Sequence, residues 1–88
     1  KAALVLSRAL DLAEAAMPAT VTALHSLIHD TIAAEPRATI RAIDIRDATT
    51  LDEVDGQITA PVVILLSVEF GPVLLIDNRV IDPAKETP

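Results

Sequence analysis

The spacing of the apolar residues changes once along this chain, close to Pro36, and that change restricts the folds open to it. Before Pro36 the apolar residues recur every three or four positions, which is the period of an amphipathic helix. After Pro36 they alternate or run continuously in segments rich in β-branched residues, which is typical of strands. A chain of 88 residues buries a single core. We therefore predict one α+β domain in which the helices come first and the strands follow.

The first helix is predicted over residues 3–17. Its apolar face consists of Ala3, Leu6, Leu10, Ala13 and Met17. Pro18 ends the helix, because proline disfavours helical geometry in the residue before it. No capping residue stands at Lys1, so we expect this helix to begin further upstream in a longer chain.

A second helix is predicted from the capping residue Thr20 to about Glu35, before Pro36. Its apolar stripe consists of Val21, Leu24, Leu27, Ile28, Thr31 and Ile32. Only a few residues separate the two helices, so we expect them to pack as a helical hairpin or to meet at a sharp elbow.

Three later segments predict strands. Residues 39–46 alternate, and neither side is purely apolar, which indicates an edge strand. One side would carry Thr39, Arg41, Ile43 and Ile45, and the other Ile40, Ala42, Asp44 and Arg46. Residues 61–68 are mostly β-branched residues and leucine, which predicts a strand buried on both faces. Residues 69–72 contain a Gly-Pro pair and predict a turn, after which residues 73–76 return as the partner strand, closed by Asp77-Asn78.

The segment between the first two strands predicts a short helical turn. Residues 50–53 match a capping box, and Asp55-Gly56 breaks the turn soon afterwards. We therefore predict two helices packed on one face of a small antiparallel sheet of about three strands. We predict a single domain over residues 1–82, which ends just after the short apolar pair Val80-Ile81. Residues 83–88 are predicted to form a frayed tail.

The composition argues against several kinds of partner. Binding of nucleic acid calls for a basic face and stacking aromatics, whereas this chain has a net charge of −6, one Phe and no Trp or Tyr. There is no cysteine, so disulfides are excluded and a reducing cytoplasm is compatible. Residues 60–76 are the most membrane-like, but they contain Glu69 and the Gly-Pro pair, so a hairpin describes them better and we expect a soluble chain. A mean hydropathy of +0.45 suggests that a partner or a further domain covers some apolar surface.

Two histidines are candidate metal ligands. His25 and His29 stand four apart on the second predicted helix, a spacing that can place both on one metal ion. The chain has no H-E-x-x-H pattern and no cysteine to complete the ligand set. A solvated helix face explains this pair better, and no metal site is predicted.

The remaining candidates for chemistry are acidic residues and serines. The acidic residues at predicted turns and strand ends are Asp44, Asp47, Asp52, Glu53, Asp55, Glu69, Asp77 and Asp82. Hydrogen bonding within turns suffices to explain them, since a catalytic pair needs a cleft that separates two pKa values. The serines, Ser7, Ser26 and Ser67, lie in no G-x-S-x-G elbow, and the only glycines, Gly56 and Gly71, form no phosphate loop. We therefore predict no catalytic, cofactor-binding or metal-binding residue in this chain.

The C-terminal half carries a resemblance to a known family. Ile40-Arg41-Ala42-Ile43-Asp44-Ile45-Arg46-Asp47 is followed by Thr50-Leu51, a Val-Asp-Gly loop, an apolar strand, a glycine turn and Leu75-Ile76-Asp77-Asn78. This order resembles the tail of the pantothenate synthetase family, in which a pattern like D-Y-x-E-L-x-D-x-x-T-L precedes an apolar strand and G-x-T-R-L-I-D-N. The opening helix is similar to the family's A-x-x-L-S-x-A-L helix, so the resemblance runs from about Ala2 to about Ile81.

Two departures accompany the resemblance. Ala42 stands where the family usually has an aromatic residue, and Pro72-Val73-Leu74 replaces its usual small-Thr-Arg. No contact of that arginine is therefore carried over to this chain.

The resemblance implies that the chain is the C-terminal lid domain of a cytoplasmic ligase that condenses pantoate with β-alanine. In that family ATP and Mg²⁺ serve the reaction, which passes through a pantoyl-adenylate and releases pyrophosphate and AMP. The HIGH-like, K-M-S-K-S-like and S-S-R-N motifs of the family precede this region, and none is present here. The resemblance thus implies a partner in the N-terminal nucleotide-binding domain, a homodimeric full-length enzyme and no activity of the 88 residues alone.

Two other interpretations stay open at this point. The chain could be a free-standing protein-interaction module that shares only the layout. It could also be a binding domain for a small acid that uses Arg41, Arg46 and Arg79, although three scattered arginines are more often surface charge than an anion clamp.

Overall fold

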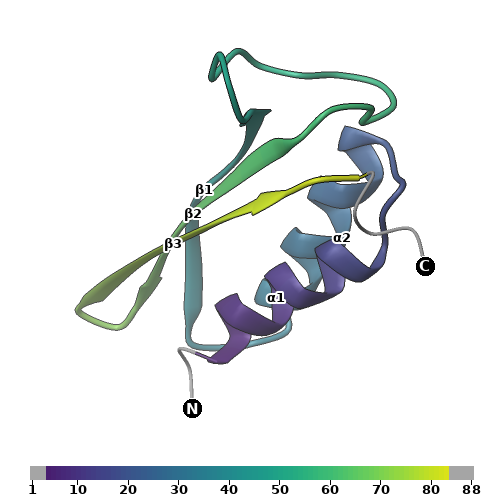
Figure 1. Cartoon of the computed structure of the whole chain (residues 1–88). Coiled ribbons are helices and arrows are strands. Elements are labelled where there is room, and N and C mark those ends of the chain that lie inside the picture. Colours follow the sequence, from purple (N-terminus) through teal and green to yellow (C-terminus); the bar gives the residue numbers. More distant parts are fainter. Residues whose placement is uncertain (1–3, 84–88) are drawn as a thin grey trace.

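The computed structural model describes residues 4–83 and has two layers, helices and a sheet (Figure 1). Its elements are α1 (Leu4–Ala15), α2 (Val21–Ala33), β1 (Ala38–Asp47), β2 (Val62–Phe70) and β3 (Val73–Ile81). The strands form one antiparallel sheet in the order β1-β2-β3, and both helices cover the same face of it. The predicted α+β class is confirmed. The start of the first helix and residues 84–88 of the predicted tail lie outside the described residues.

The two helices form the predicted helical hairpin, with α1 and α2 packed against each other (Figure 1). Thr20 caps α2 as predicted, since its hydroxyl accepts a hydrogen bond from the N–H of Ala23 at 3.1 Å. The helix α1 ends at Ala15, two residues earlier than predicted, so Met17 is buried from the connection rather than from the helix. Proline at position 18 accounts for the early end.

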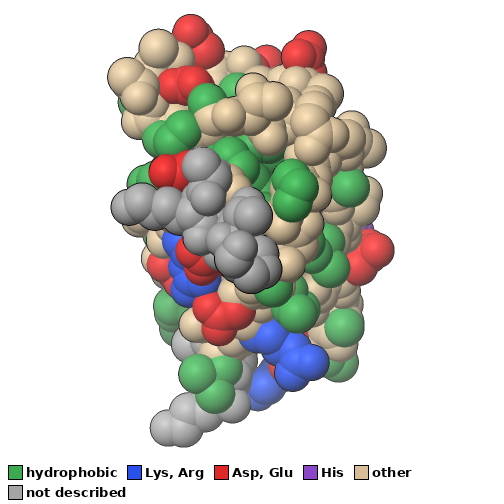
Figure 2. Space-filling view, turned by 45° about the vertical axis from the view of Figure 1, so that its right-hand side comes forward, with side chains coloured by type: hydrophobic (Ala, Val, Ile, Leu, Met, Phe, Trp, Pro, Cys, Tyr) green, Lys and Arg blue, Asp and Glu red, His purple; other side chains and the backbone are tan. Residues whose placement is uncertain are grey.

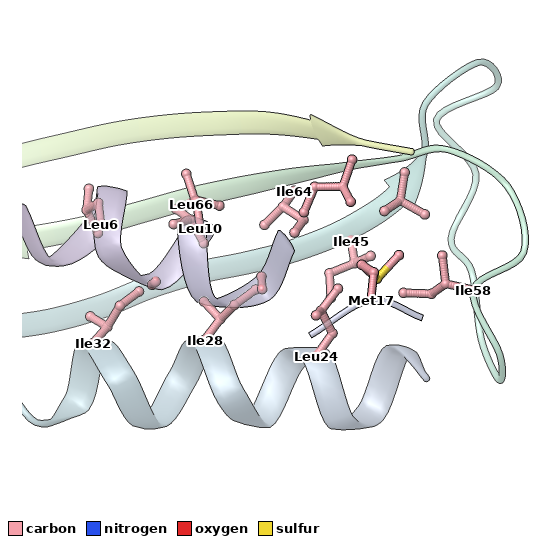
Figure 3. Close-up of a cluster of buried hydrophobic side chains, with 14 of the residues drawn as sticks. Leu6, Leu10, Met17, Leu24, Ile28, Ile32, Ile45, Ile58, Ile64 and Leu66 are labelled. Carbon is pink, nitrogen blue, oxygen red and sulfur yellow. The ribbon is translucent and has the colours of Figure 1, made fainter. Parts of the chain in front are cut away.

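The core lies between the helices and the inner face of the sheet. Figure 3 shows Leu24, Ile28 and Ile32 projecting from α2 into this core, and each is 0% exposed. The buried residues of α1 are Leu6, Ala9, Leu10 and Ala13. The small alanines on α1 let the two helices and the sheet approach closely around the larger side chains of α2.

The predicted alternation of β1 is wrong in its first half. Ile40 pairs with Val68 and Ala42 with Ser67, so Arg41 is an extra residue, a β-bulge, in the ladder. The bulge reverses the alternation between residues 40 and 42, and Ile40 consequently joins Ile43 and Ile45 on the inner face. The burial of three isoleucines on one side is the physical reason for the irregularity. The prediction that β1 is an edge strand is confirmed.

The central strand β2 is not buried on both faces, as its apolar run predicted. Its residues alternate between buried and half-buried, because both helices lie on the inner face. The buried set is Val62, Ile64, Leu66 and Val68. Leucine and valine at the alternate positions therefore belong to an outer face that no described helix covers.

The third strand is longer than predicted, because it continues through Asp77 and Asn78 to Ile81. These two residues pair with Leu66 and Leu65 of β2. Hydrogen bonding to the backbone of β2 outweighs the low intrinsic strand propensity of Asp and Asn. The turn before β3 is a two-residue hairpin in which Gly71 has a φ of 61°, a conformation that glycine adopts without steric cost.

The segment 48–61 contains no helix, and the predicted capping box is wrong. The N–H of Leu51 donates to the carbonyl of Asp47 at 2.9 Å, so the one turn of this kind lies at residues 47–51, before the predicted position. The hydroxyl of Thr50 accepts the N–H of Asp52, two residues on, at 3.2 Å. The carboxylate of Asp47 instead organises the turn, accepting the N–H groups of Thr49 and Thr50 at 2.8 and 2.9 Å. Leu51 then adopts a left-handed φ of 64°, which is incompatible with a helix at this point.

The end of this segment is tied to the connection between the helices. The N–H of Ile58 donates to the carbonyl of Ala19 at 3.0 Å, and the N–H of Val21 donates to the carbonyl of Gly56 at 2.9 Å. Ile58 is buried beside Met17 and closes one end of the core (Figure 3).

Candidate functional site

The main candidate for a functional surface is the outer face of the sheet, which lies opposite the two helices. The strand registers place on it Thr39, Arg41, Ala42, Asp44 and Arg46 of β1, Val63, Leu65, Ser67 and Glu69 of β2, and Leu74, Ile76, Asn78 and Val80 of β3. Charged residues belong mainly to the β1 side, whereas the β3 side is apolar apart from one asparagine. The sequence interpretation missed this surface because it ended the last strand at Ile76; the alternation of Leu74, Ile76 and Val80 was the available signal.

The apolar side of this outer face is open to solvent. Ile76 is 73% exposed, Val80 58% and Leu74 50%. Isolated exposed apolar residues are ordinary, but three of them on one strand, beside half-buried Val63 and Leu65, form a continuous patch. Such a patch is typical of a surface that contacts another protein or domain.

The arginines that suggested an anion clamp are each engaged by acidic groups. Arg41 pairs with Glu69 on the outer face. The guanidinium of Arg79 lies on the inner side, 2.6 Å from Asp11 and 3.1 Å from Glu14. These contacts, the hydrogen bond to Asp11 foremost, raise the pKa of Arg79 above its usual value.

Arg46 completes this set of arginines. It donates to the carbonyl of Leu51 at 3.2 Å and lies 3.9 Å from Glu53. Because the three arginines lie on opposite sides of the sheet and each has a carboxylate, they do not converge on an anion, and the small-acid interpretation is not supported.

A hollow of about 280 Å³ lies beside the segment 48–61, and three of the predicted acidic residues line it: Asp47, Glu53 and Asp55. Figure 2 shows acidic side chains at this end of the molecule and others lower on the same face. The N–H groups of Thr50 and Thr49 hold the pKa of Asp47 below its usual value, because they stabilise the charged carboxylate. Asp47 therefore has a structural role in the turn.

A second hollow, of about 370 Å³, lies between the two helices and was not predicted from the sequence. Its lining is Val5, Arg8, Leu12, Thr31, Ala34 and Glu35. The carboxylate of Glu35 is engaged by Arg37, whose side-chain hydrogen bond lowers the pKa of Glu35. The hydroxyl of Thr31 donates to the carbonyl of Leu27 at 2.7 Å, so Thr31 and Glu35 are not hydrogen-bonded to each other as a nucleophile and its base.

The other candidates are dispersed over the structure. His25 and His29 are both exposed on α2, and the nearest acidic contact is that of His29 with its neighbour Asp30 at 3.2 Å. Ser7 lies on α1, Ser26 on α2 and Ser67 on the outer face of β2, and none of these described serines is hydrogen-bonded to a histidine.

The remaining acidic residues are equally scattered: Asp44 and Glu69 lie on the outer face, Asp77 on the inner side of β3, Asp52 in the segment 48–61 and Asp82 after β3. Within residues 4–83, no group of three His, Cys, Asp or Glu side chains is arranged to hold a metal ion. None of the helices in the described part of the chain is both long and apolar enough to cross a membrane. The fold and its surfaces therefore define a small α+β domain whose distinctive feature is an exposed sheet face.

Comparison with known proteins supplies the family. The family model for pantoate-beta-alanine ligase matches residues 1–80. A pantothenate synthetase of Bartonella tribocorum is 45% identical over 62 residues, which are 70% of this chain and 22% of that protein. Pantothenate synthetases of Sinorhizobium medicae and Agrobacterium fabrum are each 39% identical over 94% and 96% of this chain, respectively, and over 30% of their own lengths. The chain belongs to the pantoate-beta-alanine ligase family, and it spans less than a third of the length of these relatives.

Proposed function

We propose that this chain is the C-terminal lid domain of a cytoplasmic pantothenate synthetase that condenses pantoate with β-alanine at the expense of ATP. The observation that carries the proposal is the family match over residues 1–80 together with the small share of the relatives that the chain spans. The dispersed acidic residues, histidines and serines agree with a domain that leaves the chemistry to another part of the enzyme.

Residues 4–83, which the structure describes, do not fit an ATP or Mg²⁺ site. A phosphate loop needs several glycines whose N–H groups converge, and Gly56 and Gly71 lie in separate turns. A magnesium site needs carboxylates that converge, and the described part of the chain has no group of three His, Cys, Asp or Glu side chains arranged to hold a metal ion. In the hollow beside the segment 48–61, Asp47 binds the N–H groups of its turn and Glu53 faces Arg46. We therefore assign nucleotide and metal to the rest of the proposed enzyme, together with its homodimer contacts.

The proposed role of the domain is to close over the nucleotide site and to open for product release. An acyl-adenylate reacts readily with water, and closure of a lid excludes water during the reaction. Rigid packing of α1 and α2 on the sheet suits a domain that moves as a unit, because the core is continuous from the helices to β2.

The first test of the proposal is to determine the coding sequence upstream of Lys1. We expect an open frame with HIGH-like, K-M-S-K-S-like and S-S-R-N motifs, and we expect its product to form pantothenate from pantoate, β-alanine and ATP. The 88-residue chain alone should form none at a measurable rate. Pantothenate formation by the 88 residues alone would refute the lid assignment.

A free-standing interaction module is the second candidate, and the exposed apolar side of the outer face favours it. A start codon directly before Lys1 would support this candidate over the lid. The family membership would then describe ancestry rather than activity.

A further inference from the structure

The dipeptide Asp55-Gly56 lies in the segment 48–61, which arches from the end of β1 toward α2 (Figure 1). Both of its residues are exposed. Asp55 also lines the hollow of about 280 Å³ beside this segment, so solvent reaches its carboxyl group. The carboxylate of Asp47 accepts two backbone N–H groups, whereas the side chain of Asp55 has no hydrogen bond or ion pair with any residue of the described range 4–83.

The backbone nitrogen of Gly56 is open as well. Gly56 is hydrogen-bonded through its carbonyl, which accepts the N–H of Val21 at 2.9 Å, and its own N–H donates to no group among the described residues. Its φ is 67°, and no atom beyond its neighbours in the chain lies within 4 Å of the position that a Cβ would occupy. The nitrogen that follows Asp55 is therefore sterically accessible, because glycine has no side chain to shield it.

An aspartate that precedes an accessible nitrogen can close a five-membered ring. The nitrogen of Gly56 attacks Cγ of the protonated Asp55 carboxyl and forms a C–N bond, while the N–H proton and the carboxyl hydroxyl leave together as water. The attack is intramolecular, so no second molecule has to be positioned. Water then opens the succinimide: cleavage at Cγ restores aspartate, and cleavage at the former main-chain carbonyl leaves isoaspartate. One water is lost and one is gained, and no oxidant or cofactor is needed.

The neighbouring aspartates lack one or other of these features. The carboxylate of Asp47 is held by the N–H groups of its turn. Asp77 lies within the ladder between β2 and β3, which fixes its backbone. Asp52 precedes a glutamate, whose side chain shields the next nitrogen. Accessible carboxyl and accessible nitrogen thus coincide at Asp55.

We propose that Asp55-Gly56 is a modification site, at which spontaneous succinimide formation converts the aspartate to isoaspartate and detaches the segment 48–61 from the start of α2. Isoaspartate lengthens the main chain by one carbon atom directly before the carbonyl of Gly56 that holds the N–H of Val21. Its free α-carboxylate is the group that an isoaspartyl methyltransferase esterifies. The inference concerns the covalent chemistry of this chain and does not depend on the ligase assignment.

The attachment at risk closes one end of the core. Besides the bond to Val21, the N–H of Ile58 donates to the carbonyl of Ala19 at 3.0 Å. Ile58 is only 4% exposed and belongs to the buried cluster beside Met17 (Figure 3). A displaced Gly56 disturbs both bonds, because they flank it within two residues, and water then reaches this end of the core.

Peptide mapping of the aged 88-residue chain tests the site with internal controls. Cleavage after Arg46 and Arg79 gives one peptide that contains four aspartates, at positions 47, 52, 55 and 77. The chain is aged in mildly acidic buffer, both folded and in urea, and electron-transfer fragmentation of the peptide locates isoaspartate. An isoaspartyl methyltransferase with labelled S-adenosylmethionine measures its total amount.

We expect isoaspartate to form at Asp55 at least about tenfold faster than at the other three aspartates. The rate in the folded chain should lie within about tenfold of the rate in urea, since an exposed segment needs little opening. Equal rates at the four aspartates, or a folded-chain rate more than about tenfold below the rate in urea, would overturn the proposal.

Two variants, verified as folded by circular dichroism, separate the proposed chemistry from other causes. Gly56→Ala should slow the reaction about tenfold, because a methyl group shields the nitrogen. Asp55→Glu keeps the charge but would have to close a six-membered ring, so methylation should fall to the level of the other aspartates. An unchanged rate in Gly56→Ala, or undiminished methylation of Asp55→Glu, would also overturn the proposal.

Amide hydrogen exchange, followed by NMR on the aged chain, tests the structural consequence. The N–H groups of Val21 and Ile58 should exchange about tenfold faster in the modified fraction, while that of Ile28 in the middle of α2 stays protected. Asp55→Glu aged in parallel should show no change. Retained protection of Val21 and Ile58 in the modified fraction would refute the detachment of the segment.

Discussion

Deleting one residue from β1 tests whether the bulge at Arg41 directs the isoleucines of this strand into the core. Arg41 is the extra residue in the ladder, so its deletion leaves both neighbours opposite their present partners on β2. The deletion removes one side-chain interaction, the exposed ion pair between Arg41 and Glu69. Exposed pairs contribute about 0–1 kcal/mol, and we expect the deletion to lower the free energy of unfolding by no more than about 1 kcal/mol.

Deleting Asp44 instead should be more costly. The rest of the pairing with β2 is kept if the strand loses its bulge when Asp44 is deleted. Ile43 then moves to the outer face, and Ala42 takes its place on the inner face. Replacing a fully buried isoleucine by alanine costs about 2–5 kcal/mol. Ile43 is half-buried, so we expect the free energy of unfolding to fall by roughly 1–2.5 kcal/mol.

Urea unfolding of the 88-residue chain, followed by far-ultraviolet circular dichroism, measures both effects, because the chain has no Trp or Tyr for fluorescence. With a denaturant slope of about 1 kcal/mol/M, the Asp44 deletion should lower the midpoint by roughly 1–2.5 M. The variant Arg41→Ala removes the ion pair without a change in length and should match the Arg41 deletion. Equal midpoints for the two deletions, or a lower midpoint for the Arg41 deletion, would refute the reasoning about the bulge.

Three further predictions concern packing and charge. Ile28→Ala, at a site with 0% exposure, should lower the free energy of unfolding by about 2–5 kcal/mol, whereas Ile76→Ala, at 73% exposure, should change it by no more than about 0.5 kcal/mol; urea titration of both variants checks this contrast. The pKa of Asp47 is lowered in the folded state, so its stabilisation is present above its unfolded pKa of about 3.9 and disappears as the pH falls through the folded value. Thermal melts of Asp47→Asn should therefore differ from the parent at pH 7 and converge with it in acid, and a difference that stays constant with pH would contradict this role. A double-mutant cycle of Arg79→Met and Asp11→Ala should give a coupling of about 0.5 kcal/mol that shrinks at high salt, and coupling insensitive to salt would argue against an ion pair.

The sequence by itself determined the features that depend on neighbouring residues. The helical period and Thr20 set the hairpin of α1 and α2, since capping and amphipathicity act within a few residues of the chain. The mixed alternation of residues 39–46 identified an edge strand. The spacing of the Thr50-Leu51 and Leu75-Ile76-Asp77-Asn78 motifs also led to the family that the comparisons show.

Only the tertiary structure decided the features that depend on partners distant in the sequence. The bulge at Arg41 satisfies a requirement of the core, since it turns Ile40 toward the helices, and no local preference of residues 39–41 encodes it. The length of β3 follows from the backbone groups that β2 offers, and the turn after β1 follows from Asp47 rather than from a capping box. The exposed apolar side of the outer face exists because both helices pack on one side of the sheet, and the order of elements along the chain does not specify that side.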